Sequence, residues 1–249
     1  MGDGEEPPLL SRSEALSLSS GTGNRNRAGK RNKAAGPRWR HACHVLLYAP
    51  LPTGSPQPPF AILMQLRFDG LFGFPGGFVD LRKESLEAGL SRELREELGP
   101  AAAGIELRPC HHRGAKAWTG SGRKKSGSDV GRLSSEDQVG AEAQPGSGRK
   151  EQSGSDVGVV THFYIRRVSL EELGEIERGE KEAPEHGLEV QGLIRVPLGG
   201  GLPTFLQQGF IGDARAQLLG ALHDMGWDPP QDMGSRNPPH DMGLSDPPP

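Results

Sequence analysis

Short apolar segments alternate with amphipathic ones along this chain, and the alternation predicts an α/β fold. Apolar and strand-forming residues gather at 39–48, 60–68, 159–168 and 188–196, and each segment has the length of a strand. Helical patterns lie between and after these segments. Strands interleaved with helices are typical of a sheet that is covered by helices.

The segment at 85–98 has the clearest helical pattern. Ser85 can cap its N-terminus, and Gly99 ends it. At about 100° per residue, its four leucines fall within about 120° of one another. Such a stripe faces the core of a protein. The leucines are Leu86, Leu90, Leu94 and Leu98.

Two further helices are predicted nearer the C-terminus. Residues 169–178 begin with Ser169 and Glu172, which have the spacing of a capping box. In that motif each side chain accepts a hydrogen bond from the backbone N–H of the other residue. Residues 214–225 have the pattern of an amphipathic helix.

Composition separates an ordered region from segments that cannot build a core. The 249 residues include 37 glycines and 22 prolines, about twice the usual combined share. Aliphatic periodicity is missing from both ends of the sequence. We therefore predict a disordered basic tail at 1–36, one domain at 37–226 and a disordered Pro/Gly-rich tail at 227–249.

An internal duplication interrupts the domain. GSGRK occurs at 120–124 and 146–150, and SGSDVG occurs at 126–131 and 153–158. Neither copy carries an apolar face, so the duplication does not indicate a solenoid. We predict a disordered loop insertion over residues 111–158, which a surface position tolerates at small entropic cost.

Charge and cysteine content exclude several classes of protein. A formal net charge of −3 indicates no particular partner. The basic residues between 25 and 33 fit a solvated tail, a nuclear address or an arm that contacts phosphates. Cys43 and Cys110 provide neither a disulfide framework nor metal-site spacing. No apolar run approaches about 18 residues, so we expect no membrane span, and we expect no secretory signal.

Three glutamates lie beside the leucine stripe of the helix at 85–98. Glu93 and Glu97 fall at its edge, and Glu96 lies next to them. Carboxylates three and four residues apart on a helix repel one another, and the repulsion grows where the dielectric constant is low. A solvated acidic face is the alternative interpretation. A divalent ion such as Mg²⁺ would resolve the repulsion, because it binds carboxylates together with substrate phosphates.

A glycine-rich segment precedes this helix. Gly73, Gly76 and Gly77 surround a Phe-Pro pair, and glycines let the backbone approach a ligand closely. Such a loop alone is more often a simple turn. Its position ahead of a helix with clustered carboxylates favours a site for a phosphate ligand.

These residues together resemble a Nudix box. Gly77, Glu84 and the run RELREELG at 92–99 follow the family pattern, with one additional residue between Gly77 and Glu84. Further segments, among them WRHACHVLLYAP, LFGFPGGFVD and FIGDAR, resemble the snoRNA-decapping branch of the Nudix hydrolases, the type-16 group. The resemblance covers most of 39–110 and 158–226.

The resemblance implies an α/β/α sandwich around a mixed sheet, with Mg²⁺ or Mn²⁺ as cofactor. It implies hydrolysis of the diphosphate in capped RNA or in inosine-type nucleoside diphosphates. The implied metal ligands are the Gly76 carbonyl, Glu93, Glu96 and Glu97. The three glutamates are also the implied catalytic residues, and one of them would act as general base. Arg92 is expected to pair with a glutamate and brace the helix.

Four residues match the family positions that contact the nucleotide. They are His44, Arg67, Phe74 and Gln217. His44 or Phe74 would stack on a purine, and Arg67 would meet a phosphate. The alternatives are a structural strand histidine for His44, a core aromatic for Phe74, and solvated surface residues for Arg67 and Gln217.

The chain also departs from the family pattern. Gly220 stands where the family has a further metal-binding glutamate, and the insertion replaces a loop that carries a metal-edge histidine. His111, His112 and Trp118 fit that histidine poorly. A weakly active or inactive Nudix-fold protein that binds RNA, and a poorly folding relic, are therefore alternatives. The resemblance further suggests a homodimer located in the nucleus or nucleolus, and also in the cytoplasm.

Overall fold

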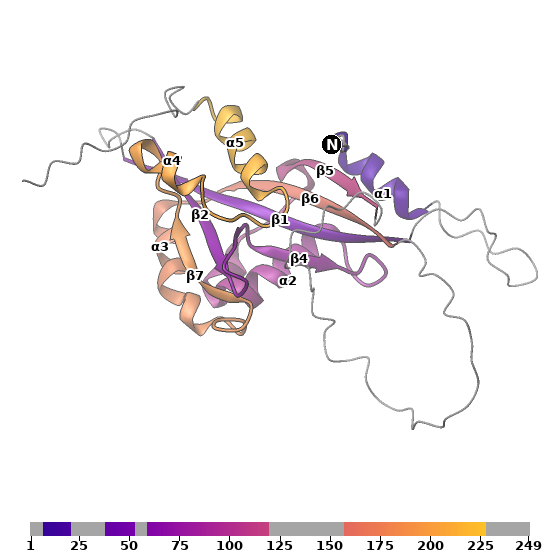
Figure 1. The fold of residues 1–249 in the computed structure, drawn as a ribbon. Helices are drawn as coiled ribbons and strands as arrows, with labels where there is room; N and C mark the ends of the chain where they lie inside the picture. Colours follow the sequence, from indigo (N-terminus) through magenta and orange to yellow (C-terminus); the bar gives the residue numbers. More distant parts are fainter. Residues whose placement is uncertain (1–6, 21–37, 53–58, 120–156, 228–249) are drawn as a thin grey trace, which may run out of the picture.

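The computed structural model describes residues 7–20, 38–52, 59–119 and 157–227. Within these segments seven strands form one sheet (Figure 1). The strands are β1 (Arg38–Pro50), β2 (Phe60–Arg67), β3 (Phe72–Gly73), β4 (Gly76–Val79), β5 (His112–Trp118), β6 (Val157–Arg167) and β7 (Val190–Arg195).

The sheet is mixed, as the family resemblance implied. Its main order is β3-β2-β1-β6-β5, with β4 also pairing with β1 and β7 with β2. Strands β1 and β6 run parallel, while the other pairs are antiparallel. Strand β1 is central because it pairs with three others, and its side chains alternate between the two faces of the sheet.

Helices cover both faces and complete an α/β/α sandwich (Figure 1). The helices are α1 (Arg12–Ser20), α2 (Leu86–Leu98), α3 (Leu170–Gly179), α4 (Leu202–Phe205) and α5 (Ala214–Asp224). Short 3-10 turns lie at η1 (Pro100–Gly104), η2 (Pro109–His111), η3 (Glu180–Glu182) and η4 (Gly199–Gly201). No described helix is long and apolar enough to cross a membrane.

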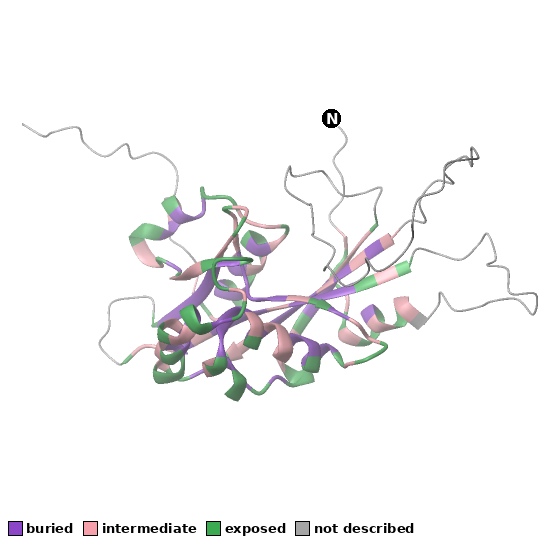
Figure 2. Ribbon diagram, turned by 90° about the horizontal axis from the view of Figure 1, so that it is seen from below, coloured by how far each residue is buried: buried purple, intermediate pink, exposed green. Residues whose placement is uncertain are grey.

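The hydrophobic core has two main layers, one on each side of β1. Val45 and Leu47 pack with α2 and α3 on one face. Leu46 points to the other face and packs with α4 and α5. Figure 2 shows the buried positions concentrated along the sheet and on the inner sides of the helices. A strand buried on both faces needs a nearly continuous apolar sequence, which 45–47 supply.

The predicted helix ends are confirmed. The Ser85 hydroxyl accepts a hydrogen bond from the backbone N–H of Ala88 at 3.1 Å, which caps α2. At the start of α3, Ser169 and Glu172 form the expected capping box, with bonds of 3.0 and 2.6 Å.

The prediction of a disordered tail at 1–36 is wrong for its central part. Residues 12–20 form helix α1, and Leu10 pairs with Ala115 at the edge of β5. Ala15 is fully buried against Val160. Most of the stability of a short helix comes from tertiary packing rather than from its own sequence, so composition alone missed this one. Residues 21–36 lie outside the described residues.

The predicted insertion also begins too early. Residues 112–118 form strand β5, and residues 157 and 158 already belong to β6. The two strands pair in register over 114–118. Strand β5 contains glycine and charged residues and is held by backbone pairing, so its sequence resembles a loop. The rest of the insertion, 120–156, and the C-terminal tail at 228–249 lie outside the described residues.

An ion pair ties α1 to α2. The Arg12 guanidinium donates two hydrogen bonds to the Glu87 carboxylate, at 2.8 and 2.9 Å. The Tyr164 hydroxyl donates a third at 3.0 Å. Burial disfavours the charged carboxylate, yet the hydrogen bonds from Arg12 and Tyr164 hold the pKa of Glu87 below its ordinary value. Helix α1 is therefore connected to the first turn of α2.

Three histidines form a hydrogen-bonded chain beneath α1. His162 lies in the middle, 2.9 Å from His41 and 3.1 Å from His112 between ring nitrogens. The Ser19 hydroxyl meets the outer nitrogen of His41 at 2.6 Å. Burial lowers the pKa of His41, that of His162 to about 3 and that of His112 to about 4. All three rings are neutral at pH 7.

We expect acid to weaken the fold through this chain. A histidine has a pKa of about 6.5 when unfolded, so below pH 6.5 the unfolded state binds protons that the folded state refuses. His162 should then remove about 2 kcal/mol of stability between pH 7 and pH 5. Urea unfolding at both pH values would show a smaller loss in His162→Asn than in the unmodified protein. An equal loss in the two proteins would contradict this expectation.

Candidate active site

Helix α2 presents its leucine stripe to the sheet, as predicted. The four leucines of this stripe are at most 1% exposed. This orientation brings Glu97 against β4 and β2, and Glu93 against β4. The geometry of the site therefore follows from the packing of α2.

Glu97 is buried and both of its oxygens accept hydrogen bonds. Oε2 accepts from the Gly76 backbone N–H at 2.6 Å, and Oε1 accepts from the Gln65 side-chain amide at 3.1 Å. The residue is only 4% exposed. Burial raises the pKa of Glu97 to about 8, although the two hydrogen bonds oppose the shift.

Glu93 lies against the second glycine of β4. A Cβ atom at Gly77 would stand 2.5 Å from Oε2 of Glu93. A side chain at position 77 would therefore displace the carboxylate. Burial raises the pKa of Glu93 to about 7, with Arg92 opposing the shift and Glu96 adding to it.

Gly76 is required for a different reason. Its φ of 130° is unfavourable for residues with a side chain, and a Cβ there would stand 2.0 Å from the Cys43 carbonyl oxygen on β1. The backbone itself would have to move. Gly76 thus leaves room for the backbone of the neighbouring strand β1, and Gly77 leaves room for the Glu93 carboxylate.

Arg92 connects the acidic residues, which confirms its predicted bracing role. Its Nη1 lies 2.8 Å from Glu93 and 2.9 Å from Glu96. Its Nη2 donates to Glu84 at 3.1 Å and to the Phe78 carbonyl at 3.0 Å. One guanidinium therefore neutralises part of the charge of three carboxylates and ties α2 to β4.

Two residues of this site were not predicted from the sequence. Gln65 comes from β2 and bonds to Glu97. Glu185 donates its backbone N–H to the Glu96 carbonyl at 3.0 Å, and its charge raises the pKa of Glu93 and Glu97. Both are distant in sequence from α2, and no local pattern marks them.

The predicted substrate residues His44 and Arg67 lie on the sheet. His44 stands opposite Gly76 in the β1–β4 pair. Burial, with a smaller contribution from Arg67, lowers the pKa of His44 to about 4, so its ring is neutral. Arg67 ends β2 and pairs with Asp69 at 3.2 Å.

The other two predicted substrate residues, Phe74 and Gln217, lie in the core and on α5. Phe74 is 3% exposed and packs against Phe163 in the core, with ring centroids 5.3 Å apart. Gln217 is half-buried on α5. The nucleotide contacts of these residues, and those of His44 and Arg67, stay predictions.

Comparison with known proteins places this arrangement in a family. The model of the family described as "Nudt16-like: U8 snoRNA-decapping enzyme-like" matches residues 41–124 and 129–226. The chain belongs to the Nudt16-like family. The U8 snoRNA-decapping enzymes that resemble this chain are Nudix hydrolases, which act on phosphoanhydride bonds, and the predicted resemblance is confirmed.

Curated relatives of two kinds are similar to this chain. The U8 snoRNA-decapping enzymes of Ovis aries and Bos taurus are each 44% identical over 200 residues, covering 77% of this chain and 84% of theirs. The Tudor-interacting repair regulator protein of Homo sapiens is 38% identical over 196 residues, covering 75% and 74%. The relatives of this chain are therefore named for different activities.

Nudix proteins generally use divalent metal ions, and the donor atoms here are suitable for one. Glu93, Glu96 and Glu97 offer only carboxylate oxygens, which suit hard cations. Burial is the main cause of the raised pKa values of Glu93 and Glu97, with smaller contributions from neighbouring glutamates, and a bound cation would oppose both shifts. Among the described residues, no group of three His, Cys, Asp or Glu side chains stands in metal-binding geometry. Arg92 is paired with Glu93 and Glu96, and the Gly76 N–H donates to Glu97.

One departure from the family pattern is clear in the structure. Gly220 lies on the exposed side of α5, and a Cβ there would meet no atom within 4 Å. A longer side chain would fit at this position. Crowding therefore does not explain why glycine stands where a glutamate was expected.

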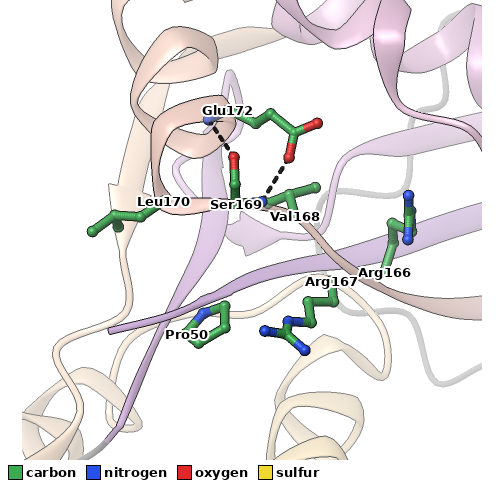
Figure 3. Close-up of a pocket in the computed structure, with 7 residues that line it drawn as sticks. All are labelled: Pro50, Arg166, Arg167, Val168, Ser169, Leu170 and Glu172. Atoms are coloured by element: carbon green, nitrogen blue, oxygen red, sulfur yellow. Dashed lines mark hydrogen bonds between the residues drawn. The ribbon is translucent and has the colours of Figure 1, made fainter. Parts of the chain in front are cut away.

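A separate surface pocket lies at the C-terminal end of β6. It is lined by Pro50, Arg166, Arg167, Val168, Ser169, Leu170 and Glu172 (Figure 3). Figure 3 shows Arg166 and Arg167 pointing apart, while Glu172 bonds back to Ser169. The pocket contains no predicted site residue. The Glu172 carboxylate already accepts a hydrogen bond from the Ser169 N–H at the N-terminus of α3.

The two glycines of β4 should respond differently to alanine. In Gly77→Ala the Glu93 side chain can swing away, so the protein should stay folded while hydrolysis falls about 10- to 100-fold, as expected for a displaced catalytic group. In Gly76→Ala the clash is with backbone, so the thermal midpoint itself should fall. Activity assays and thermal melts would separate the two.

The matched control is Gly104→Ala, because a Cβ at Gly104 meets no atom within 4 Å. It should change neither activity nor melting. Full activity in Gly77→Ala would show that the position of Glu93 does not matter.

Proposed function

We propose that this chain is a metal-dependent phosphohydrolase that cleaves the diphosphate of capped RNA, and also inosine-type nucleoside diphosphates. The observation that supports it is the fixed position of Glu97, whose two oxygens are held by Gly76 and Gln65 beside Glu93. Decapping enzymes at 44% identity support the RNA substrate.

Glu93, Glu96 and Glu97 would hold Mg²⁺ or Mn²⁺ together with the Gly76 carbonyl. The bound ion would neutralise the diphosphate and acidify a water molecule. The other groups that the reaction needs come from the side chains of the protein. In the metal-free protein, burial raises the pKa values of Glu93 and Glu97 to about 7 and 8, and one of the three glutamates would act as the general base. Neutral His44 offers one ring N–H donor and one acceptor to a base.

The same proposal includes the cellular location and the oligomeric state of the protein. The basic residues between 25 and 33 and the decapping relatives support a location in the nucleus or nucleolus, with a share in the cytoplasm. We also propose a homodimer, as the family resemblance suggests. Fluorescence imaging of the tagged chain and sedimentation analysis test these two points.

A second candidate is an RNA-binding Nudix-fold protein with little turnover. Gly220 removes one family carboxylate, and relatives at 38 to 40% identity bear the name Tudor-interacting repair regulator protein. A folded protein that binds RNA but shows no turnover at high Mn²⁺ would favour this candidate.

Hydrolysis by the purified protein tests the first proposal directly. Inosine diphosphate and a capped RNA, each with Mg²⁺ or Mn²⁺, should both be cleaved. Glu97→Gln keeps the shape but loses the charge, so the rate should fall about 10²- to 10³-fold, equivalent to several kcal/mol of transition-state stabilisation.

Glu175→Gln is the matched control, because Glu175 is exposed on α3. Its rate should equal that of the unmodified protein. Equal rates in Glu97→Gln and in the unmodified protein would remove the glutamate cluster from the mechanism.

Metal binding should release protons near neutral pH. Because the pKa values of Glu93 and Glu97 are raised to about 7 and 8, part of the population is protonated at pH 7 and must ionise before binding a cation. The apparent affinity for Mn²⁺ should therefore rise from pH 6 to pH 9. Calorimetric titrations in buffers of different ionisation enthalpy measure the proton release, and an affinity independent of pH would contradict it.

A further inference from the structure

Gln65 has a buried side-chain amide at a position whose neighbours on the same face of the strand are apolar. It lies on β2 and is 1% exposed. Ala61 and Leu63 precede it on the same face of the strand and belong to the apolar core under α2. Buried amides are unfavourable unless their polar atoms are satisfied, so its presence requires an explanation.

One half of the amide is explained by Glu97. The Gln65 Nε2 donates to Oε1 of Glu97 at 3.1 Å, while Oε2 accepts from Gly76 at 2.6 Å. Two donors from different strands hold the two oxygens of one carboxylate. Rotation of that carboxylate would break at least one of these bonds.

The other half of the amide has no partner. Its Oε1 is buried and accepts no hydrogen bond among the described residues. Reversing the amide would place this oxygen against the ionised Glu97 carboxylate, the form that binds a cation, where two acceptors would repel. Unsatisfied buried polar atoms are rare in folded proteins, and this one belongs to a residue that touches a predicted catalytic group.

We propose that Gln65 is a positioning residue of the hydrolase: its N–H group fixes the Glu97 carboxylate, and its free oxygen accepts a hydrogen bond from a water molecule of the metal-loaded site. The inference rests on the proposed function, because it assigns Glu97 to the metal. It explains both halves of one buried amide, whereas a purely structural role explains only the first.

Gln65→Met tests the proposal, because methionine has a similar length and no hydrogen-bonding groups at its end. Binding of Mn²⁺ to the substrate-free protein, measured by calorimetry, should weaken about 10-fold, as expected when a residue that orients a ligand is lost. The kcat for inosine diphosphate should fall by a similar factor with KM unchanged. The thermal midpoint of the metal-free variant should stay the same or rise.

Leu63→Met is the matched control, since it lies two positions earlier on the same face. It should leave Mn²⁺ affinity and kcat unchanged. Unchanged Mn²⁺ affinity in Gln65→Met, together with a lower thermal midpoint, would show a structural role only and overturn the proposal.

Two further measurements complete the test. Glu97→Gln should weaken Mn²⁺ binding; if it does and Gln65→Met does not, the inference fails while the proposed function stands. If the unmodified protein binds no Mn²⁺, both fail. Should Gln65→Met not fold, a crystal structure of the Mn²⁺-loaded unmodified protein decides: a water molecule within hydrogen-bond distance of Gln65 Oε1 supports the proposal, and none there overturns it.

Discussion

The close approach of α2 to strand β4 is the constraint on which this molecule depends. Gly76 and Gly77 remove the side chains that would otherwise separate the strand from its neighbours. The leucines of α2 supply the apolar contact that holds the helix there. Glu93 and Glu97 are carried inward by that packing, and the energy of the hydrophobic layer is what holds two carboxylates in a place they would otherwise avoid.

The site that results is electrostatically incomplete. Arg92 is the cation bonded to Glu93, Glu96 and Glu84, and it lies at the outer side of the cluster. Glu97, deeper in the protein, accepts hydrogen bonds from two neutral donors among the described residues. A cation of higher charge density would stabilise such a site, and phosphate ligands would help to bind that cation. Its arrangement therefore favours diphosphate chemistry before any substrate is considered.

Local signals carried most of what the sequence predicted. The leucine stripe, the cap at Ser85 and the spacing of the three glutamates are all contained within one helix, so their geometry follows from helical periodicity. The main strands were equally visible, because each is apolar over several residues. The site residues on α2 and β4 were found this way.

The remainder depends on contacts between distant segments. Gln65 and Glu185 enter the site through the sheet topology, which no short pattern encodes. Helix α1 was missed because Arg12 and Ala15 find their partners on other elements. Strand β5 was missed because the pairing with β6 compensates for its weak strand sequence. The composition of a segment indicates whether it can form a hydrophobic core by itself. It does not indicate whether the segment can pack into a core that other segments form.

The histidine chain beneath α1 has a directional consequence. Each neutral imidazole carries one hydrogen on one of its two nitrogens. If Ser19 donates to His41, then His41 must donate to His162 and His162 to His112; if His112 donates, every bond runs the other way. Only these two tautomeric arrangements satisfy all the bonds. The state of a hydroxyl on the N-terminal helix is thereby coupled to a ring on the edge strand β5, with no movement of the backbone.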